Sequence, residues 1–409
     1  MNDIVVIGGG AAGLMAAIAA GERGAAVRLL EPNERLGKKV NITGKGRCNV
    51  TNDCDPETFL RHVPGNGRFL YSALRHWTPR DTMAFFEAIG VKLKVERGSR
   101  VFPVSDSAFT ITSALEKRLR QLRVRWEHDR AVSLQIEEGA VTAVVGEKGT
   151  YPCRAAILCT GGVSYPATGS TGDGYRLARE AGHTVIEPRG SLVPLESPED
   201  CCAQMQGLGL KNVELTVYNE KNKPVFREFG EMLFTHFGVS GPLVLSASAH
   251  LRGWGKETYR ASIDLKPALD ERKLEERILR DLGENPNRDF ENILSGLVPH
   301  SMVPVLSRRL SLPRGLKANA VTRQQRHALI ELLKRFPLAL SGPRPAAEAI
   351  VTAGGVKVAE VVPGTMASKR TEGLYLAGEV LDVDAYTGGF NLQIAWATGH
   401  LAGCSAAEK

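Results

Sequence analysis

The chain begins with a short hydrophobic run that passes directly into glycine. Residues 3–8 (DIVVIG) predict a buried strand, and the alanine-rich stretch after them (GGGAAGLMAAIAA) predicts a helix. A second hydrophobic run, AAVRLL, predicts another strand that ends at Glu31. This order of strand, glycine turn, helix and strand is typical of a βαβ unit in a parallel sheet.

Two further hydrophobic runs predict strands of the same sheet. Residues 155–159 are followed by the turn Thr160-Gly161-Gly162, and residues 373–377 are followed by Glu379. After a second glycine pair, a helix is predicted to begin at about Phe390. The fold class is therefore α/β, with a Rossmann-like domain whose two halves are far apart in the sequence.

The middle of the chain has a different pattern. Residues 191–263 alternate short β-rich runs with glycine and proline turns, which predicts a small barrel-like or sandwich domain. From residue 266 onward, hydrophobic residues recur at three- and four-residue spacing, and prolines break the predicted helices. We predict a discontinuous domain of residues 1–190 and 346–409, a β-rich insert of residues 191–265 and a basic helical insert of residues 266–345.

The glycines of the first turn have the spacing G-x-G-x-x-G. Gly8 allows the tight turn, Gly10 lets a pyrophosphate approach the backbone, and Gly13 lets the helix lie close to the sheet. The N–H groups at the start of the helix attract phosphate. Glu31, eighteen residues beyond Gly13, is placed to accept hydrogen bonds from ribose hydroxyls. The pattern predicts a dinucleotide site.

The other end of the chain indicates that the dinucleotide is FAD. A strand, Gly378-Glu379, a glycine turn and a helix resemble the segment of glutathione-reductase-type enzymes that binds the ribityl chain and the flavin, although those enzymes have Asp where this chain has Glu379. The segment "ATGG…TGDG" of fumarate-reductase-like flavoproteins is similar to residues 159–174. No second strand-linked glycine motif is found, so NADPH or NADH is expected only as a transient electron donor.

Composition places the chain among ordinary globular proteins. It has 409 residues, of which 43% are hydrophobic and 24% charged. No basic leader and no apolar stretch of about 20 residues is found, so we expect a cytoplasmic location and no membrane contact. The seven cysteines show neither zinc-type nor C-x-x-C spacing, which predicts reduced thiols and no metal.

The net charge of +7 is concentrated in one region. Between residues 301 and 344, the acid Glu331 is outnumbered by basic residues that run from Arg308 to Arg344. These residues could form a solvated helix face, or they could contact the phosphates of an RNA substrate.

The segment VNITGKGRCNVTN, residues 40–52, permits several interpretations. Its glycine spacing differs from that of a P-loop, and Cys48 and Cys54 are separated by five residues rather than the four of disulfide reductases. Asp53 and Asp55 would also raise the pKa of Cys54. We favour a loop that passes under the flavin, with Asn49 and Thr51 at the ring edge; a helix-capping polar turn is the alternative.

Four segments resemble the YhiN/BaiN-type (HI0933-like) family of FAD-dependent oxidoreductases: GKGRCNVTN, GEMLFTHFGVSGP, VTAGGVKVAEV and GEVLDVDAYTGGFNLQIAWATG. The resemblance extends over nearly the whole chain and implies the fold and FAD. Members of this family are linked to reduction of conjugated bonds in steroid-type acids, to dihydrouridine formation in ribosomal RNA and to amine oxidation. The resemblance therefore implies an oxidoreductase, but it leaves the substrate open.

The chemistry that we predict is hydride transfer from flavin N5 to an electron-poor C=C bond, followed by protonation of the adjacent carbon. The candidate acids are Cys48, His236 and Tyr386, each of which has a structural role as its alternative. The other hypotheses are an amine oxidase that uses O₂ and a non-catalytic flavoprotein that binds RNA or senses redox state.

The predicted cofactor contacts form one set. They are Gly8, Gly10, Ala11, Ala12, Gly13, Glu31, Pro32, Lys38, Lys39, Arg47, Cys48, Asn49, Ala131, Val132, Thr160, Gly161, Gly162, Gly378, Glu379, Gly389, Asn391, Leu392 and Gln393. Lys38, Lys39 and Arg47 are expected to neutralise the pyrophosphate.

Overall fold

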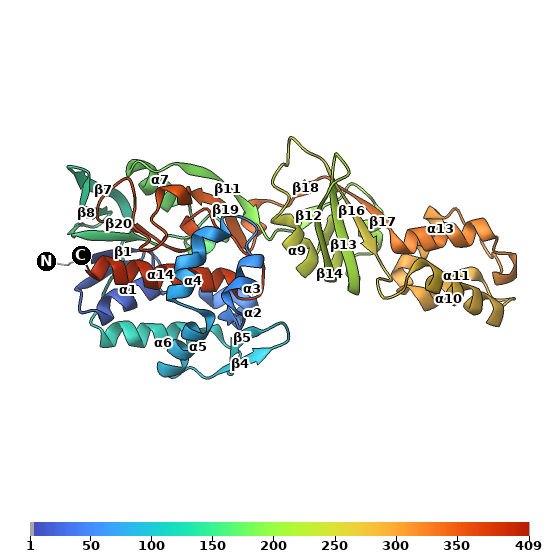
Figure 1. The fold of residues 1–409 in the computed structure, drawn as a ribbon, viewed down its shortest axis with the longest axis horizontal. Helices are drawn as coiled ribbons and strands as arrows, with labels where there is room; N and C mark the ends of the chain where they lie inside the picture. The colour runs from blue at the N-terminus through green and yellow to red at the C-terminus, as the bar shows by residue number, and fades with distance from the viewer. Residues whose placement is uncertain (1–3, 409) are drawn as a thin grey trace. The chain divides into compact units, whose positions relative to one another are not determined.

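The computed structural model describes residues 4–408, which divide into two compact units. The first unit contains the chain up to Ser191 and again from Pro345 onward, and the second is the contiguous segment Leu192–Arg344. In Figure 1 the blue and red ends of the chain both belong to the first unit, and the second runs from light green to orange.

A five-stranded parallel sheet forms the centre of the first unit, in the order β20-β10-β1-β2-β6. All residues of β1 and β10 are buried, as expected for a parallel sheet covered on both faces. The strands are β1 (Ile4–Ile7), β2 (Val27–Leu30), β6 (Arg125–Glu127), β10 (Ala155–Leu158) and β20 (Leu374–Leu376).

The helices α1 (Ala11–Glu22) and α14 (Phe390–Glu408) lie side by side in this unit (Figure 1). Their backbones touch through a G-x-x-x-G pair on α14. A Cβ on Gly399 would lie 2.3 Å from the carbonyl oxygen of Ala12, and one on Gly403 would lie 2.3 Å from that of Ala16. No side chain larger than hydrogen fits at either position, so this contact fixes the spacing of the two helices.

Smaller elements surround the central sheet. The antiparallel strands are β3 (Thr51–Asn52), β4 (Leu93–Glu96), β5 (Arg100–Pro103), β7 (Ala131–Glu137), β8 (Ala140–Gly146), β9 (Thr150–Pro152), β11 (Val185–Ser191) and β19 (Val351–Val356). The helices are α2 (Thr43–Gly46), α3 (Pro56–Arg61), α4 (Tyr71–His76), α5 (Pro79–Ala88), α6 (Ala108–Gln121) and α7 (Asp173–Glu180).

The second unit contains an antiparallel sheet in the order β17-β16-β13-β14-β15-β12-β18. Strands β12 to β16 lie within the predicted β-rich insert, residues 191–265, whereas the edge strands β17 and β18 come from residues 336–343, which were predicted as part of the helical insert. The strands are β12 (Leu195–Glu196), β13 (Gly209–Asn219), β14 (Pro224–Thr235), β15 (Gly238–Ser240), β16 (Tyr259–Asp264), β17 (Phe336–Leu340) and β18 (Gly342–Pro343). The helices are α8 (Cys201–Gln204), α9 (Pro242–Ser248), α10 (Glu271–Glu284), α11 (Phe290–Leu297), α12 (Val303–Arg309) and α13 (Arg323–Lys334).

The predicted α/β class is confirmed by the parallel sheet and its glycine turn. Helix α14 begins at Phe390, the residue at which the glycine pair placed its start. Within residues 4–408, no helix is both long and apolar enough to cross a bilayer.

Candidate functional site

The glycine turn after β1 leaves free space at the start of α1. Gly8 has φ +103°, and a Cβ there would lie 2.6 Å from the carbonyl oxygen of Cys159. A Cβ on Gly13 would lie only 1.8 Å from the oxygen of Gly8, whereas a Cβ on Gly10 would meet nothing within 4 Å. No side chain caps the helix at Gly10. The positive end of α1 therefore faces free space that a pyrophosphate can fill.

Glu31 lies at the end of β2 and is 8% exposed. One carboxylate oxygen accepts from the backbone N–H of Gly9 at 2.7 Å. The other accepts from the backbone N–H and the side-chain amide of Asn33, at 2.9 and 2.7 Å. These bonds hold the carboxylate beside the glycine turn, where a carboxylate would meet a ribose.

A cluster of polar side chains joins the two halves of the first unit. Lys39 Nζ donates to Glu379 Oε2 and to Ser164 Oγ, both at 2.7 Å. Glu379 Oε1 accepts from Ser164 Oγ at 3.0 Å and from the backbone N–H of Thr352 at 2.7 Å. Lys39 and Glu379 were predicted separately as cofactor contacts, and the structure brings them together.

The sequence interpretation missed Ser164 and Thr352. The hydroxyl of Thr352 accepts from the backbone N–H groups of Val163 and Ser164, at 2.8 and 3.2 Å, and so fixes the glycine turn after β10. A Cβ on Gly162 would lie 2.2 Å from that hydroxyl. Thr352 lies in VTAGGVKVAEV, one of the four segments that resemble the HI0933-like family. That resemblance was the signal by which Thr352 could have been identified.

Residues 40–52 form a compact polar loop. It comprises a short 3₁₀ turn (Val40–Ile42), the single helical turn α2 and strand β3. Gly44, Lys45 and Cys48 have left-handed backbone conformations, with φ of 57°, 60° and 59°. Non-glycine residues adopt this region seldom, and such strain is common where a backbone is shaped around a ligand.

Two buried polar atoms have no hydrogen-bond partner among the described residues and belong to predicted cofactor contacts: Asn49 Oδ1 and Thr160 Oγ1. An unpaired buried polar atom costs about 1–3 kcal/mol, so such atoms usually await a ligand or water. A flavin offers both an N–H donor and carbonyl acceptors. Together with the free start of α1, these atoms make the first unit a site that fits FAD.

The two cysteines of this loop are poor nucleophiles. Cys48 is fully buried, and burial raises the pKa of its thiol to about 12 although a hydrogen bond with Thr43 opposes the shift. Burial, followed by the charges of Asp55 and Asp53, raises the pKa of Cys54 to about 11. The acidic neighbours act in the predicted direction, and burial has the larger effect. Neither thiol is activated as a redox nucleophile must be.

The other basic residues near the loop differ in their surroundings. Arg47 lies over the ring of Phe102 and is bound by Glu96 and Asp106. Lys38 is exposed, with its Nζ 3.4 Å from Asn33 Oδ1. Lys39 alone of the three predicted cations is bonded to a second predicted cofactor residue, Glu379. For Arg47 and Lys38 a contact with the pyrophosphate stays a prediction.

The start of α14 is fixed by a network of amides. Asn391 accepts from the backbone N–H of Ala385 at 2.9 Å and donates to the carbonyl oxygens of Ala385 and Tyr386. Gln393 is fully buried and accepts from the hydroxyls of Thr51 and Thr82, both at 2.8 Å. The bonds of Asn391 hold the loop before the helix in position, and those of Gln393 join the helix to β3 and α5.

Three rings gather beside this network. His62 stacks on Phe390 with centroids 4.5 Å apart and meets Tyr386 edge-on at 5.6 Å. The backbone N–H of Tyr386 donates to the carbonyl oxygen of His62 at 2.9 Å. Tyr386 was predicted as an acid, whereas His62 was missed, because only the fold brings α3 beside the start of α14.

The remaining predicted cofactor contacts also belong to the first unit. A Cβ on Gly378 would lie 2.7 Å from that of Ala12, and one on Gly389 would lie 2.3 Å from the oxygen of Thr51. Ala131 is buried in β7, and the carbonyl of Val132 accepts from Arg176. The others are Ala11, Pro32, Gly161 and Leu392.

His236 belongs to the second unit, after β14, and its ring packs edge-on against Phe237 with centroids 5.0 Å apart. Its approach to the flavin stays a prediction.

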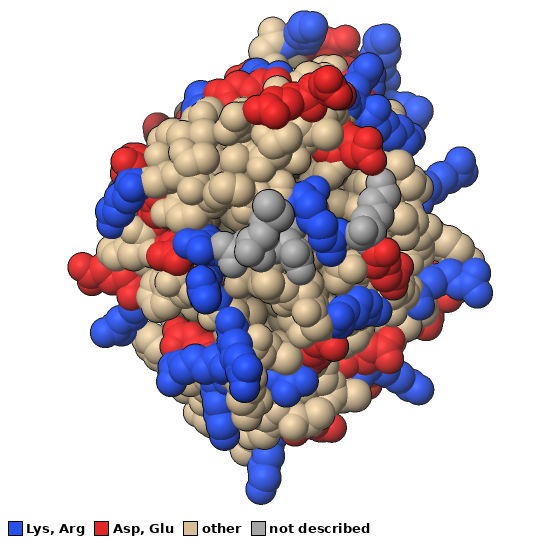
Figure 2. Space-filling view, turned by 90° about the vertical axis from the view of Figure 1, so that its left-hand side faces the viewer, with Lys and Arg blue, Asp and Glu red and all other residues tan. Residues whose placement is uncertain are grey.

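Most charges of the basic segment have acidic partners that lie outside the segment. Arg309 is bound by Glu199, Lys334 by Asp264 and Arg335 by Glu271. Lys317 and Arg344 likewise bind Asp289 and Glu196. Figure 2 shows that basic and acidic side chains are also interspersed on the face around β7 and β8 of the first unit. The local excess of positive charge is thus much smaller in space than along the sequence.

Known proteins match this chain over nearly its whole length. The family model described as HI0933-like protein Rossmann domain matches residues 2–405. A 3-dehydro-bile acid delta(4,6)-reductase of Clostridium scindens is 34% identical over 418 residues and covers 100% of both chains. A ribosomal RNA dihydrouridine synthase of Escherichia coli is 33% identical over 402 residues, with 97% of this chain and 96% of that protein covered.

Solved structures show the same fold. A 3-ketosteroid-delta4-(5alpha)-dehydrogenase from Rhodococcus jostii superposes with a TM-score of 0.53 at 16% identity, over 100% of this chain and 97% of that chain. A 3-ketosteroid delta1-dehydrogenase from Sterolibacterium denitrificans gives 0.52 at 14% identity, over 100% of both chains.

Proposed function

Because the chain belongs to the HI0933-like family of FAD-dependent oxidoreductases, we propose that it is a reductase that takes electrons from NADPH or NADH and saturates an electron-poor C=C bond. FAD, when bound, supplies the hydride from N5. The protein must hold the dinucleotide, orient the substrate and provide a proton for the second carbon.

The observation that carries the proposal is the set of unsatisfied polar positions in the first unit. The uncapped start of α1 at Gly10, Asn49 Oδ1 and Thr160 Oγ1 are the groups that a flavin dinucleotide would satisfy. The direction of the reaction rests on the relatives: both are full-length, and the names of both describe saturation of a C=C bond.

Two substrate classes fit this chemistry. A small conjugated acid or enone requires only a pocket at the flavin. A uridine in ribosomal RNA requires in addition an unstacked base and phosphate contacts, for which the basic segment Arg308 to Arg344 is the candidate. Since acids within the second unit already bind Arg309, Lys334 and Arg335, we favour the small substrate. The net charge of +7 and the dihydrouridine synthase relative support RNA as the second candidate.

Tyr386 is our candidate for the acid. It is 8% exposed and lies in the loop held by Asn391, directly before the helix that is expected to face the flavin. His62 would orient its ring. Cys48 is less suitable because it has no exposed surface, and His236 stands as a further candidate from the second unit.

Anaerobic titration of the purified protein with NADPH and NADH tests the reductase proposal. We expect a bound flavin spectrum that bleaches with one of the two donors and recovers when a conjugated enone acid is added. Recovery only with ribosomal RNA lacking dihydrouridine would favour the second substrate. Rapid recovery with an amine and O₂, accompanied by hydrogen peroxide, would indicate an oxidase instead, and a protein without flavin would refute the cofactor assignment.

The role of Tyr386 can be tested with Tyr386→Phe. Loss of a general acid should lower kcat by about 100-fold while FAD remains bound, because only the hydroxyl is removed. Tyr71→Phe is the matched control, since Tyr71 is 45% exposed. An unchanged kcat in Tyr386→Phe would exclude this tyrosine as the proton donor.

The variant Cys48→Ser tests whether Cys48 contacts the substrate or only lines the pocket. We expect the variant to retain flavin and most of its turnover, because the native thiol is buried and protonated. A loss of turnover with the flavin still bound would show instead that Cys48 reaches the substrate.

A further inference from the structure

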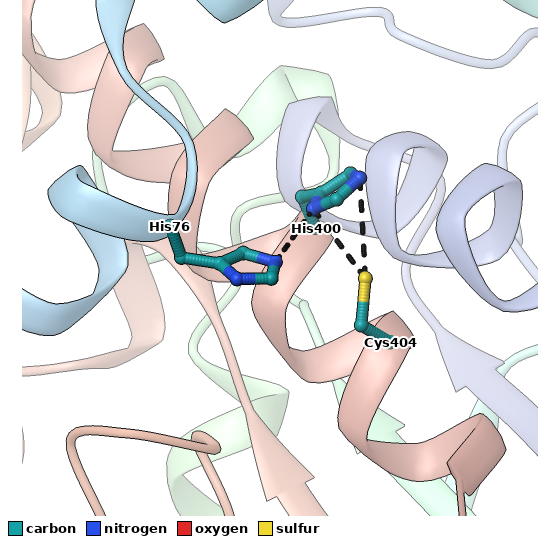
Figure 3. Close-up of side chains that lie close together, drawn as sticks. All are labelled: His76, His400 and Cys404. Atoms are coloured by element: carbon teal, nitrogen blue, oxygen red, sulfur yellow. Dashed lines mark hydrogen bonds between the residues drawn. The ribbon is translucent and has the colours of Figure 1, made fainter.

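A second cluster of potential ligands lies in the C-terminal half of α14. Figure 3 shows His76, from the end of α4, beside His400 and Cys404 of α14. His400 and Cys404 are four residues apart and therefore share one helix face. His76 Nε2 is 3.1 Å from His400 Nδ1, and Cys404 Sγ is 3.4 Å from the same nitrogen. All three potential ligand atoms lie within 4.8 Å of one another.

These separations are close to those of a tetrahedral metal site. With Zn–N bonds near 2.0–2.1 Å and a Zn–S bond near 2.3 Å, tetrahedral angles place two nitrogens about 3.3 Å apart and a nitrogen about 3.6 Å from a sulfur. The separations of His400 Nδ1 from His76 Nε2 and from Cys404 Sγ are each about 0.2 Å shorter than these values. The third separation, between the His76 and Cys404 ligand atoms, is within 4.8 Å and would shorten to about 3.6 Å around a bound ion.

We propose that His76, His400 and Cys404 form a zinc site that fastens α4 to the C-terminal half of α14. Two imidazoles and one thiolate are ligands that Zn²⁺ prefers, and water would complete the tetrahedron. His400 and Cys404 are 8% and 2% exposed, whereas His76 is exposed, so the ion would reach the buried pair past His76.

The surroundings favour neutral imidazoles. Burial, together with the charges of His76 and Arg23, lowers the pKa of His400 to about 3, and burial is also the main cause that lowers the pKa of His76. Burial raises the pKa of Cys404 to about 11. At neutral pH, zinc would therefore bind one neutral nitrogen from each histidine and the thiolate of Cys404. The thiol proton of Cys404 would be released to solvent when the Zn–S bond forms.

Charged groups near the cluster oppose one another. Arg23 disfavours a cation there, and Glu22, Glu408 and Asp81 favour one. Arg23 is itself 3.6 Å from a carboxylate oxygen of Glu408. The nearby charges are therefore compatible with a divalent cation that is bound by one thiolate.

The site is separate from the proposed flavin chemistry. His400 is ten residues beyond the start of α14, which corresponds to about 15 Å along the helix axis. Because of this distance, we expect the zinc ion to join α4 to α14 and not to take part in the flavin reaction. The cysteine spacings of the sequence had predicted no metal, because they concern paired cysteines and not a His-x₃-Cys pair completed by a histidine from another helix.

Trp77 provides an internal reporter. Its ring stacks on His400 with centroids 3.8 Å apart and an angle of 26°. Rotation of His400 toward a metal would change the surroundings of this indole, so tryptophan fluorescence should follow zinc binding.

The test is a calorimetric zinc titration of the FAD-loaded, chelator-treated protein, repeated in buffers of different ionisation heat. We expect one Zn²⁺ per chain and release of about one proton. His76→Gln and Cys404→Ser should each weaken binding by at least about tenfold, while His300→Gln, at another exposed histidine, should not. Flavin absorbance and the unfolding midpoint of each zinc-free variant show whether it is folded.

Two results of the titration would overturn the proposal. One is the absence of saturable binding to the folded wild-type protein. The other is equal affinity of the wild type and the folded His76→Gln variant. As a second readout, zinc should raise the urea midpoint of the wild type and leave that of His76→Gln unchanged; an equal rise in both would also refute the site.

Discussion

Two helix pairs of this protein pack by opposite means. In the first unit, α1 and α14 touch backbone to backbone through Gly399 and Gly403, and α1 is buried from Ala12 to Ala20. In the second unit, α10 and α13 bury stripes of larger side chains and carry ion pairs on their exposed faces. The first contact depends on shape and tolerates no added atom. The second depends on buried side-chain volume and has free space around Gly283, the glycine of α10.

The largest effect is expected from Leu274→Ala in α10. Leu274 is fully buried, so its truncation leaves a cavity and should lower the free energy of unfolding by about 2–5 kcal/mol. Leu279→Ala on the same helix is the control, because Leu279 is 45% exposed and should cost less than about 0.5 kcal/mol. Urea unfolding measures both, and equal losses would show that the buried stripe does not stabilise this pair.

The buried carboxylate of Glu360, in the first unit, can be compared with the exposed ion pairs of α13 in the second. Burial opposes ionisation of Glu360, but hydrogen bonds from Arg370 and Thr184 lower the pKa of its carboxyl to about 2. His183 Nδ1 is 3.4 Å away, and burial lowers the pKa of that histidine, which keeps it neutral. Glu360→Gln should lower the free energy of unfolding by about 1.5–3 kcal/mol at neutral pH.

The pH dependence of this loss has a definite sign. Because the pKa of Glu360 is lower in the folded than in the unfolded chain, its stabilisation is complete above pH 4.5 and is lost as the pH falls toward 2. The difference between wild type and Glu360→Gln should shrink over that window. Glu331→Gln, at a side chain that is 64% exposed, should show little difference at any pH. A gap for Glu360→Gln that stays constant from pH 7 to pH 3 would contradict this assignment.

Gly403→Ala tests the backbone contact of α1 and α14 directly. The new Cβ would lie 2.3 Å from the oxygen of Ala16, so the helices must separate and we expect a loss of about 1–3 kcal/mol. Flavin content should fall as well, since α1 carries the glycine turn. Thermal unfolding with flavin absorbance measures both, and a variant as stable as the wild type would refute the proposed contact.

The same substitution in α10 should have the opposite sign and the smallest magnitude. A Cβ on Gly283 would meet nothing within 4 Å, and alanine favours a helix by up to about 1 kcal/mol over glycine. We therefore expect Gly283→Ala to be neutral or stabilising in the same measurement. A loss comparable to that of Gly403→Ala would show that glycine is needed for a reason other than space.

Local patterns were sufficient to predict the βαβ unit and the start of α14. Gly8, Gly13 and Gly389 are each required by a clash that any side chain would create, so their positions carry structural information in the sequence itself. The run of alanines in α1 likewise follows from its close contact with a second helix. Here the physical cause acts within a few residues of the pattern.

Long-range pairs could not be predicted in this way. Arg309 binds Glu199, 110 residues earlier, and Lys39 binds Glu379, 340 residues later. Counting charges within residues 301–344 alone therefore overestimated the basic character of this segment, because the acids that neutralise it lie elsewhere in the sequence. The pairing of His62 with Tyr386 and of His76 with His400 was inaccessible for the same reason.

The contact between α1 and α14 also sets an order for biosynthesis. The two helices are roughly 370 residues apart, so at about 5–20 residues per second a nascent α1 waits roughly 20 to 70 s for its partner to leave the ribosome. The second unit is contiguous and is complete once Arg344 has emerged. The unit that is begun first is therefore finished last, and its apolar helix needs protection from aggregation during that interval.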